Sequence, residues 1–315
     1  MAKRGSVITI GVFVFSGFLA SAPPARAQNE PIVAFKSSVD VVRISAIVRD
    51  DKGRFVRDLS VHDFEVLDGG QPQRIFDFRR DIAGVSVALL FDVSGSMEGQ
   101  LPNAREAATH VLSWLDEARD EVAIFTFDTR LDEILDFTTG LKTLPESMTS
   151  MAPFGATSLY DGIETTARKV VERDGRRHAV VVFTDGSDNA SRLTPSDVSG
   201  IASSIDVPVY IFGIVPAIDN PAENISAPAA QQLLTGGLAN LAAWTGGHLF
   251  VASGIAQRSM AARQIVDELR HQYLIAFESS GRPGWHPLVV RARSKDLIVR
   301  ARSGYFAGQS RPNSH

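Results

Sequence analysis

One carboxylate and two hydroxyl groups occupy alternate positions directly after an apolar run. In the segment VALLFDVSGSMEGQ the run ends at Asp92, and Ser94 and Ser96 follow at intervals of two residues. On an extended or turning backbone, residues i, i+2 and i+4 can project to the same side, so these three side chains can converge. Carboxylate and hydroxyl oxygens suit hard cations such as Mg²⁺ and Mn²⁺. The spacing therefore predicts a divalent-cation site.

Two further segments can supply oxygen atoms to the same place. The apolar run in HAVVVFTDGSDN ends at Asp185, and a glycine-containing loop in PFGATSLYDG carries Thr157 ahead of an expected helix. In open α/β sheets ligands bind outside the carboxyl ends of the strands, which is where both carboxylates fall. Two other acidic residues near these segments, Asp161 and Asp188, are expected to accept structural hydrogen bonds in turns or at a helix start.

The region from 84 to 270 has the pattern of an α/β domain. Apolar strands are expected at 85–91, 121–127, 178–184, 207–215 and 248–251. Between the first two strands, apolar residues recur at helical spacing, at Ala104, Ala107, Ala108, Val111, Leu112 and Leu115. Strands that are apolar on both faces and alternate with helices indicate a mostly parallel sheet covered on both sides. We therefore expect a doubly wound, Rossmann-like fold.

The segments on either side of this domain, 28–83 and 271–307, have the patterns of β-strands. Residues 38–80 alternate at period two, and the later segment has strands expected at 272–277, 287–292 and 297–302, joined by turns that contain Gly and Pro. Each segment alone is too small to bury a core comfortably. We expect them to pack together as a small β unit, with the α/β domain inserted between them. The alternative is two independent β appendages, and the tail 308–315 is expected to be disordered.

The first 27 residues have the pattern of a secretory signal peptide. Lys3 and Arg4 form a basic tip, an apolar stretch follows at 7–20, and small residues precede an expected cleavage site after Ala27. The apolar stretch is shorter than the roughly 20 residues needed to span a bilayer. We therefore predict a secreted or periplasmic protein with no stable membrane insertion after cleavage, and a retained anchor is the alternative.

The composition disfavours several functional classes. The formal net charge is −4 without a basic block, so nucleic acid is not an expected partner, and the absence of cysteine rules out disulfides. The seven histidines fall outside the three motif loops and none shows a His-x-x-x-His spacing. Metal hydrolases usually add a general base and often His ligands. Ser96 also lacks a Gly-x-Ser-x-Gly frame, so we expect no catalytic residues and no enzymatic activity.

The three segments together resemble the metal-ion-dependent adhesion site (MIDAS) of the von Willebrand factor type A domain. DVSGS matches the Asp-x-Ser-x-Ser loop of that family, GATSLYDG its threonine loop and FTDG its aspartate loop, in family order. The resemblance covers about residues 84 to 270. It implies that one divalent cation, expected to be Mg²⁺ with Mn²⁺ or Ca²⁺ as alternatives, is surrounded by Asp92, Ser94, Ser96, Thr157 and Asp185.

The segments GRFVRDLSVHDFEVLDGGQPQ and ARSGYF resemble a bacterial secreted subgroup, the von Willebrand factor A-related acidobacterial domain. The family resemblance implies that the cation keeps one coordination position open, and that an Asp or Glu of a partner protein fills it. We therefore expect a metal-dependent, adhesion-type protein-binding module. The alternative is a structural or accessory subunit of an envelope complex, in which the metal only stabilises the fold.

A proline-containing segment at 216–235 is expected to contribute to partner choice. It follows the apolar strand at 207–215 and so leaves the sheet at the same edge as the metal loops. Three prolines and few large apolar residues indicate a surface loop, and loops on a rigid scaffold often carry recognition. The alternative is a solvated linker.

Overall fold

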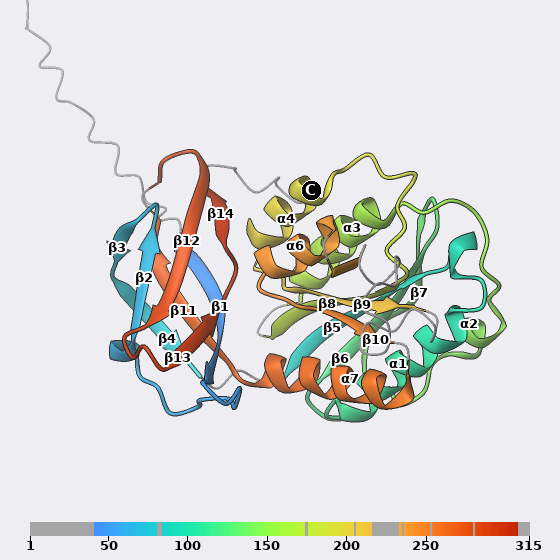
Figure 1. Ribbon diagram of the computed structural model, residues 1–315, viewed down its shortest axis with the longest axis horizontal. Coiled ribbons are helices and arrows are strands. Elements are labelled where there is room, and N and C mark those ends of the chain that lie inside the picture. Colours follow the sequence, from blue (N-terminus) through green and yellow to red (C-terminus); the bar gives the residue numbers. More distant parts are fainter. Residues whose placement is uncertain are drawn as a thin grey trace, which may run out of the picture. The chain divides into compact units, whose positions relative to one another are not determined.

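The computed structural model describes most of the chain (Figure 1). The described residues are 41–80, 84–173, 176–204, 206–215, 233–234, 236–252, 254–279 and 281–307. The predicted signal peptide, residues 28–40, nearly all of the predicted recognition loop and the tail 308–315 lie outside the described residues. The expectations for those segments therefore stay predictions.

A six-stranded sheet forms the centre of the α/β domain, in the order β10-β9-β8-β5-β6-β7 (Figure 1). Its strands are β5 (Val85–Asp92), β6 (Glu121–Phe127), β7 (Leu131–Thr139), β8 (Arg177–Thr184), β9 (Val209–Ile214) and β10 (Leu249–Ala252). All neighbouring pairs are parallel except β6 with β7. Every residue of β5, β6 and β9 is buried, which is why these strands read as nearly continuous apolar runs. The predicted fold class is confirmed.

The antiparallel edge strand β7 was not predicted. Its sequence LDEILDFTT contains no fully buried residue. An edge strand has one neighbour only, and charged side chains there discourage pairing with other chains. The pattern of β7 is therefore too polar to be read as a strand of a buried sheet.

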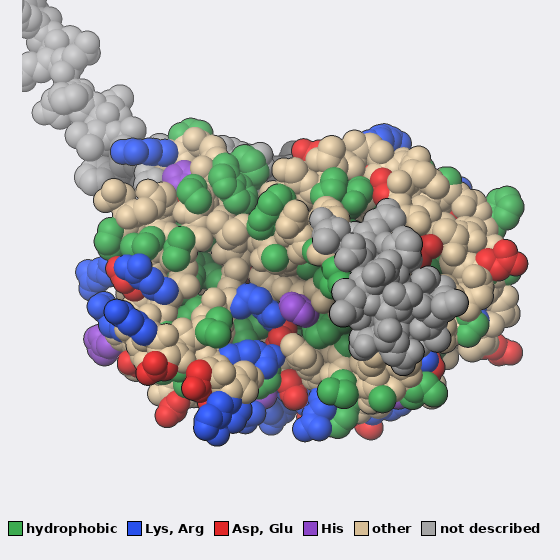
Figure 2. Space-filling view, viewed as in Figure 1, with side chains coloured by type: hydrophobic (Ala, Val, Ile, Leu, Met, Phe, Trp, Pro, Cys, Tyr) green, Lys and Arg blue, Asp and Glu red, His purple; other side chains and the backbone are tan. Residues whose placement is uncertain are grey.

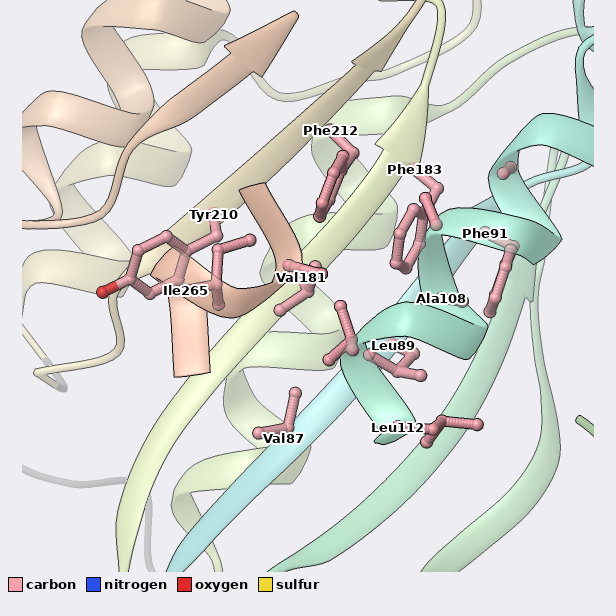
Figure 3. Close-up of a cluster of buried hydrophobic side chains, with 14 of the residues drawn as sticks. Val87, Leu89, Phe91, Ala108, Leu112, Val181, Phe183, Tyr210, Phe212 and Ile265 are labelled. Carbon is pink, nitrogen blue, oxygen red and sulfur yellow. The ribbon is translucent and has the colours of Figure 1, made fainter. Parts of the chain in front are cut away.

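Helices cover both faces of the central sheet (Figure 1). One face packs against α1 (Leu101–Trp114), the short α2 (Glu146–Ser150) and α7 (Ile255–Arg270), and the other against α3 (Leu159–Val171), α4 (Pro195–Ser204) and α6 (Gly237–Trp244). Figure 3 shows part of the first interface, where side chains of α1 and α7 meet those of the strands. Phe91, Phe183 and Phe212 stack there across three neighbouring strands, with successive ring centroids 4.8 and 5.2 Å apart.

The chain segments before and after the α/β domain form two four-stranded antiparallel sheets, in the orders β13-β1-β11-β4 and β14-β12-β2-β3. The earlier strands are β1 (Val41–Asp50), β2 (Phe64–Asp68), β3 (Gln71–Gln73) and β4 (Ile75–Arg79), with a short helix η1 (Val61–Asp63) before β2. The later strands are β11 (Gln272–Glu278), β12 (Gly284–Ala292), β13 (Leu297–Arg300) and β14 (Gly304–Ala307). Each sheet combines strands from both segments, and buried residues of both sheets share one apolar cluster. This is the small β unit of the predicted fold class, whereas the proposed domain boundaries remain a prediction.

A buried charge network connects α7 to the β unit. The carboxylate of Glu268 is fully buried and accepts hydrogen bonds from Arg49 of β1 (2.9 Å) and from Arg300 of β13. A second connection joins Asp206 to Ser45, whose hydroxyl donates to the carboxylate at 3.0 Å. These contacts connect the α/β domain to the β unit. They lie at the end of the α/β domain that is opposite the carboxyl ends of its strands.

Among the described residues, no helix is both long enough and apolar enough to cross a membrane.

Candidate metal centre

Asp92 is the last residue of β5, a strand that lies between β6 and β8 in the middle of the sheet. Its side chain is completely buried. One carboxylate oxygen, Oδ1, accepts from the backbone N–H of Ser94 at 3.0 Å and from the Ser94 hydroxyl at 2.6 Å. The other, Oδ2, accepts from the Thr184 hydroxyl at 2.7 Å. Both oxygens are therefore held in a fixed orientation.

Ser94 and Ser96 extend this arrangement toward the surface. The two hydroxyl oxygens are 3.1 Å apart, and Ser94 is buried whereas Ser96 is exposed. A short 3₁₀-helix, η2 (Gly95–Met97), turns the chain between them. The structure thus brings Asp92, Ser94 and Ser96 together as one series of oxygen atoms that runs from the core to solvent.

The loop that carries Thr157 is attached to the first loop by two backbone hydrogen bonds. The N–H of Phe154 donates to the carbonyl of Val93 at 2.8 Å, and the N–H of Gly95 donates to the carbonyl of Gly155 at 3.0 Å. Thr157 follows and is buried, just ahead of α3. The Gly155 backbone has φ +88°, in the left-handed region that favours glycine.

The third loop begins at Asp185, directly after β8. Asp185 Oδ1 accepts from the N–H of Ser187 at 2.9 Å. Farther along this loop, the side-chain oxygen of Asn189 accepts from the N–H of Thr157 at 2.8 Å, and the carbonyl of Thr157 accepts from the N–H of Asn189 at 3.1 Å. The third loop is therefore joined to the second by one side-chain and one backbone hydrogen bond between Asn189 and Thr157.

Asp188 and Asp161 accept structural hydrogen bonds, as expected. Asp188 Oδ1 accepts from the N–H of Leu159 at 2.9 Å and so caps the start of α3. Asp161 accepts from the backbone N–H groups of Arg192 and Leu193. Both carboxylates hold the third loop against α3.

Two residues of the site were not identified from the sequence. Thr184 donates to Asp92, and Asn189 connects the second and third loops. Both lie within the segment FTDGSDN that was singled out for Asp185. Thr184 directly precedes the candidate ligand Asp185, and Asn189 follows it by four residues, but sequence proximity does not say which group either side chain contacts.

The environment of Asp92 is unfavourable to a bare negative charge. Burial raises the pKa of Asp92 from its ordinary value of 3.8 to about 6; the nearby charge of Asp185 adds to this increase, and the hydrogen bonds from Ser94 and Thr184 oppose it. Within the described part of the chain, neither Asp92 nor Asp185 forms an ion pair with a lysine, arginine or histidine. A bound cation would compensate these two charges.

The chemistry of the donors fits a hard cation. The candidate set contains two carboxylates and three hydroxyls, which suit Mg²⁺, Mn²⁺ or Ca²⁺. Over the described ranges there is no group of three or more His, Cys, Asp or Glu residues that could hold a metal ion. The candidate set is of a different kind, because three of its five residues are Ser or Thr.

The described end of the 216–235 segment lies beside this site. Leu233 is buried against Gly186, the residue after Asp185. Gly186 has φ +90°, and a Cβ atom there would come within 2.3 Å of Leu233 Cδ2. Glycine is therefore required where the third loop meets Leu233. The role of the remaining loop in partner choice stays a prediction.

Comparison with known proteins identifies the domain. The family model of the von Willebrand factor type A domain matches residues 87–187, which include all five candidate ligands. No curated protein matches the chain. The family match shows that the chain contains a von Willebrand factor type A domain over these residues, and the six-stranded, mostly parallel sheet is consistent with that fold. Membership of the acidobacterial subgroup remains a prediction.

Several solved structures are similar to the chain. An aerotolerance-related membrane protein from Bacteroides fragilis NCTC 9343 is 19% identical with a TM-score of 0.47, and the match covers 59% of this chain and 100% of that chain. Proximal thread matrix protein 1 from the mussel byssus, with a zinc-occupied MIDAS motif, is 20% identical with a TM-score of 0.47, over 64% and 50% of the two chains. The von Willebrand factor type A protein from Catenulispora acidiphila is 13% identical with a TM-score of 0.47, over 86% and 76%.

Proposed function

We propose that this protein is a secreted or periplasmic binding module that uses a divalent cation to engage an acidic residue of a partner protein. The cation, Mg²⁺ in the first instance, would be held by Asp92, Ser94, Ser96, Thr157 and Asp185. The observation that carries the proposal is the series of oxygen atoms from buried Asp92 to exposed Ser96; among the described residues, no Lys, Arg or His forms an ion pair with Asp92 or Asp185. When bound, the cation would supply a positive charge at the surface with a coordination position for a carboxylate.

The protein's own residues are arranged for such a role. The Ser94 hydroxyl donates its proton to Asp92 and therefore accepts from Ser96, which leaves one lone pair of its oxygen available. The backbone bonds among the three loops hold the donors in place before any ligand binds. Preorganisation of this kind lowers the entropic cost of binding.

A binding role is favoured over hydrolysis because, among the described residues, no histidine forms a hydrogen bond with the three loops. The described hydrogen bonds of His178, His271 and His286 go to residues outside the three loops. A protein partner is favoured over nucleic acid by the acidic net charge. On the face drawn in Figure 2, the basic side chains of the described residues lie among acidic ones. The proposed location rests on the predicted signal peptide.

Mg²⁺ should stabilise the protein against heat. For an assumed millimolar Kd and about 5 mM Mg²⁺, binding to the folded state alone contributes roughly 1 kcal/mol, which for a domain of this size raises Tm by about 2 to 4 °C. Asp185→Ala should remove most of this increase and leave the metal-free protein folded, because it also removes the repulsion between Asp185 and Asp92. Ser96→Ala should weaken the response less, since water can replace a neutral ligand.

Thermal melts in EDTA and in excess Mg²⁺ or Mn²⁺ measure these effects. Asp197→Asn is a matched control, because Asp197 caps α4 through Thr194 and lies outside the three loops. It should lower Tm without changing the metal response. If wild type and Asp185→Ala respond identically to both metals, the site assignment is wrong.

Affinity capture separates the adhesion role from the alternative of a metal that only stabilises the fold. Wild type and Asp92→Ala would be immobilised and exposed to envelope extract with Mg²⁺ or with EDTA. The proposal expects a protein that is retained only by wild type and only with Mg²⁺. A metal-dependent Tm without any metal-dependent retention would favour the structural or accessory role instead.

A further inference from the structure

Phe154 is the most exposed large apolar side chain among the described residues, at 81%. It lies in the second loop, three residues before Thr157. In the part of the chain that the structure describes, it belongs to none of the three apolar clusters. Single exposed apolar residues are common on protein surfaces. Phe154 differs from the other exposed apolar residues because it lies beside the candidate ligands.

The backbone of Phe154 is held against the first loop. Its N–H donates to the carbonyl of Val93, and the carbonyl of the next residue, Gly155, accepts from Gly95. Val93 and Gly95 flank Ser94, so these bonds join Phe154 directly to the loop that carries two candidate ligands. These bonds hold the backbone of the loop that carries Phe154 against the candidate metal centre.

The turn next to this loop carries charges of both signs. The backbone carbonyl of Asp128, in the β6–β7 turn, accepts from the N–H of Ser158 at 2.7 Å, and the Asp128 carboxylate lies beside Gly155 of the second loop. Arg130 of the same turn is exposed, and no ion pair of its guanidinium group is recorded within the described ranges. Aromatic side chains and arginine are enriched at protein interfaces and in their hot spots.

We propose that Phe154 anchors the partner, and that the partner is a protein segment in which an apolar side chain stands near the Asp or Glu that fills the cation's open position. This inference rests on the proposed function and adds a specificity-determining residue to it. The apolar side chain would pack on Phe154 while the carboxylate binds at the cation. An acidic residue without an apolar neighbour should bind much more weakly.

A random peptide library displayed on phage and selected on the wild-type protein in millimolar Mg²⁺ tests the inference. The recovered peptides should contain an Asp or Glu with an apolar residue a few positions away, and EDTA should release them. For one such peptide, Phe154→Ser should weaken binding roughly 30-fold, and Phe154→Leu less. Ile298→Ser is the matched control, because Ile298 is 66% exposed but lies on β13 of the β unit; it should leave binding unchanged.

A double-mutant cycle tests whether Phe154 contacts the apolar residue of the peptide directly. Replacing the apolar residue of the peptide by serine should weaken binding to wild type but have little further effect on Phe154→Ser. The Tm of Phe154→Ser and its response to Mg²⁺ should match wild type, since the side chain is exposed.

The outcomes distinguish this inference from the function on which it rests. Recovery of Mg²⁺-dependent acidic peptides with no apolar preference, or with no loss on Phe154→Ser, would overturn the role of Phe154 and leave the proposed function intact. Failure to recover any Mg²⁺-dependent acidic peptide would count against the proposed function, and the role of Phe154 would be overturned with it.

Discussion

Replacing Asp92 by asparagine should make the metal-free protein more stable above pH 6 and remove its response to Mg²⁺. Burial is the main cause that raises the pKa of Asp92 from 3.8 to about 6. A carboxyl whose folded pKa exceeds its unfolded pKa contributes stability below pH 4, and that stability is lost as the pH rises through about 6. At pH 7.5 the ionised side chain therefore costs about 3 kcal/mol. Asparagine does not ionise and can still accept from Ser94.

Denaturation in EDTA between pH 4.5 and 8 measures this difference. The two proteins should be closest at the acid end; the variant should become the more stable as the pH rises toward 6, and the difference should stay constant above pH 6. Mg²⁺ should reverse the order above pH 6, because only wild type binds it, and its effect on wild type should fade below pH 6 as protons compete for Asp92.

Asp188→Asn is the matched control for this experiment. Asp188 lies beside the candidate ligands, but its carboxylate caps α3. We expect Asp188→Asn to lower stability while the response to Mg²⁺ remains. If Asp92→Asn proves less stable than wild type at every pH in EDTA, Asp92 is a structural hydrogen-bond acceptor and the argument for a metal ligand fails.

The second large effect is expected at Glu268, where substitution by alanine should lower the free energy of unfolding by about 2 to 4 kcal/mol. Removing one partner of a buried ion pair typically costs about 3 to 5 kcal/mol, because the other charge is left without compensation. Glu268 is fully buried between Arg49 and Arg300. The two arginine side chains are 26% and 27% exposed, so water can partly compensate them and the loss should fall toward the lower end.

Urea denaturation checks this prediction with two companion variants. Glu268→Gln keeps the shape and one acceptor, so it should lose less stability than Glu268→Ala. Glu133→Ala removes a pair with Lys169 in which both side chains are about 40% exposed, and surface pairs contribute at most about 1 kcal/mol. A loss at Glu268 no greater than that at Glu133 would show that the network contributes little to joining α7 to the β unit.

Most of the fold could be predicted because burial leaves a local signature. The apolar runs that end at Asp92 and Asp185 predicted β5 and β8, and the structure places those strands at Val85–Asp92 and Arg177–Thr184. A strand buried on both faces must be apolar throughout, so its sequence alone reveals it. β7 was missed for the same reason, since an edge strand is buried less and reads as a polar segment.

The candidate site likewise has a part that local sequence predicts and a part that it does not. The i, i+2, i+4 spacing of Asp92, Ser94 and Ser96 is local, so their convergence could be predicted from backbone geometry. The contact of Thr184 with Asp92 joins residues 92 positions apart, and no local pattern encodes it.

The tertiary structure alone decided the electrostatics of Asp92 and the exposure of Phe154. The pKa of Asp92 depends on how much of the surrounding protein excludes water from it, and Asp185 reaches it only through the pairing of β5 with β8. Phe154 has the residue type of a core side chain. It is exposed because backbone bonds to Val93 and Gly95 hold its loop at the edge of the sheet. Side-chain chemistry and local periodicity are written in the sequence, whereas desolvation and through-space contact exist only once distant segments have packed together.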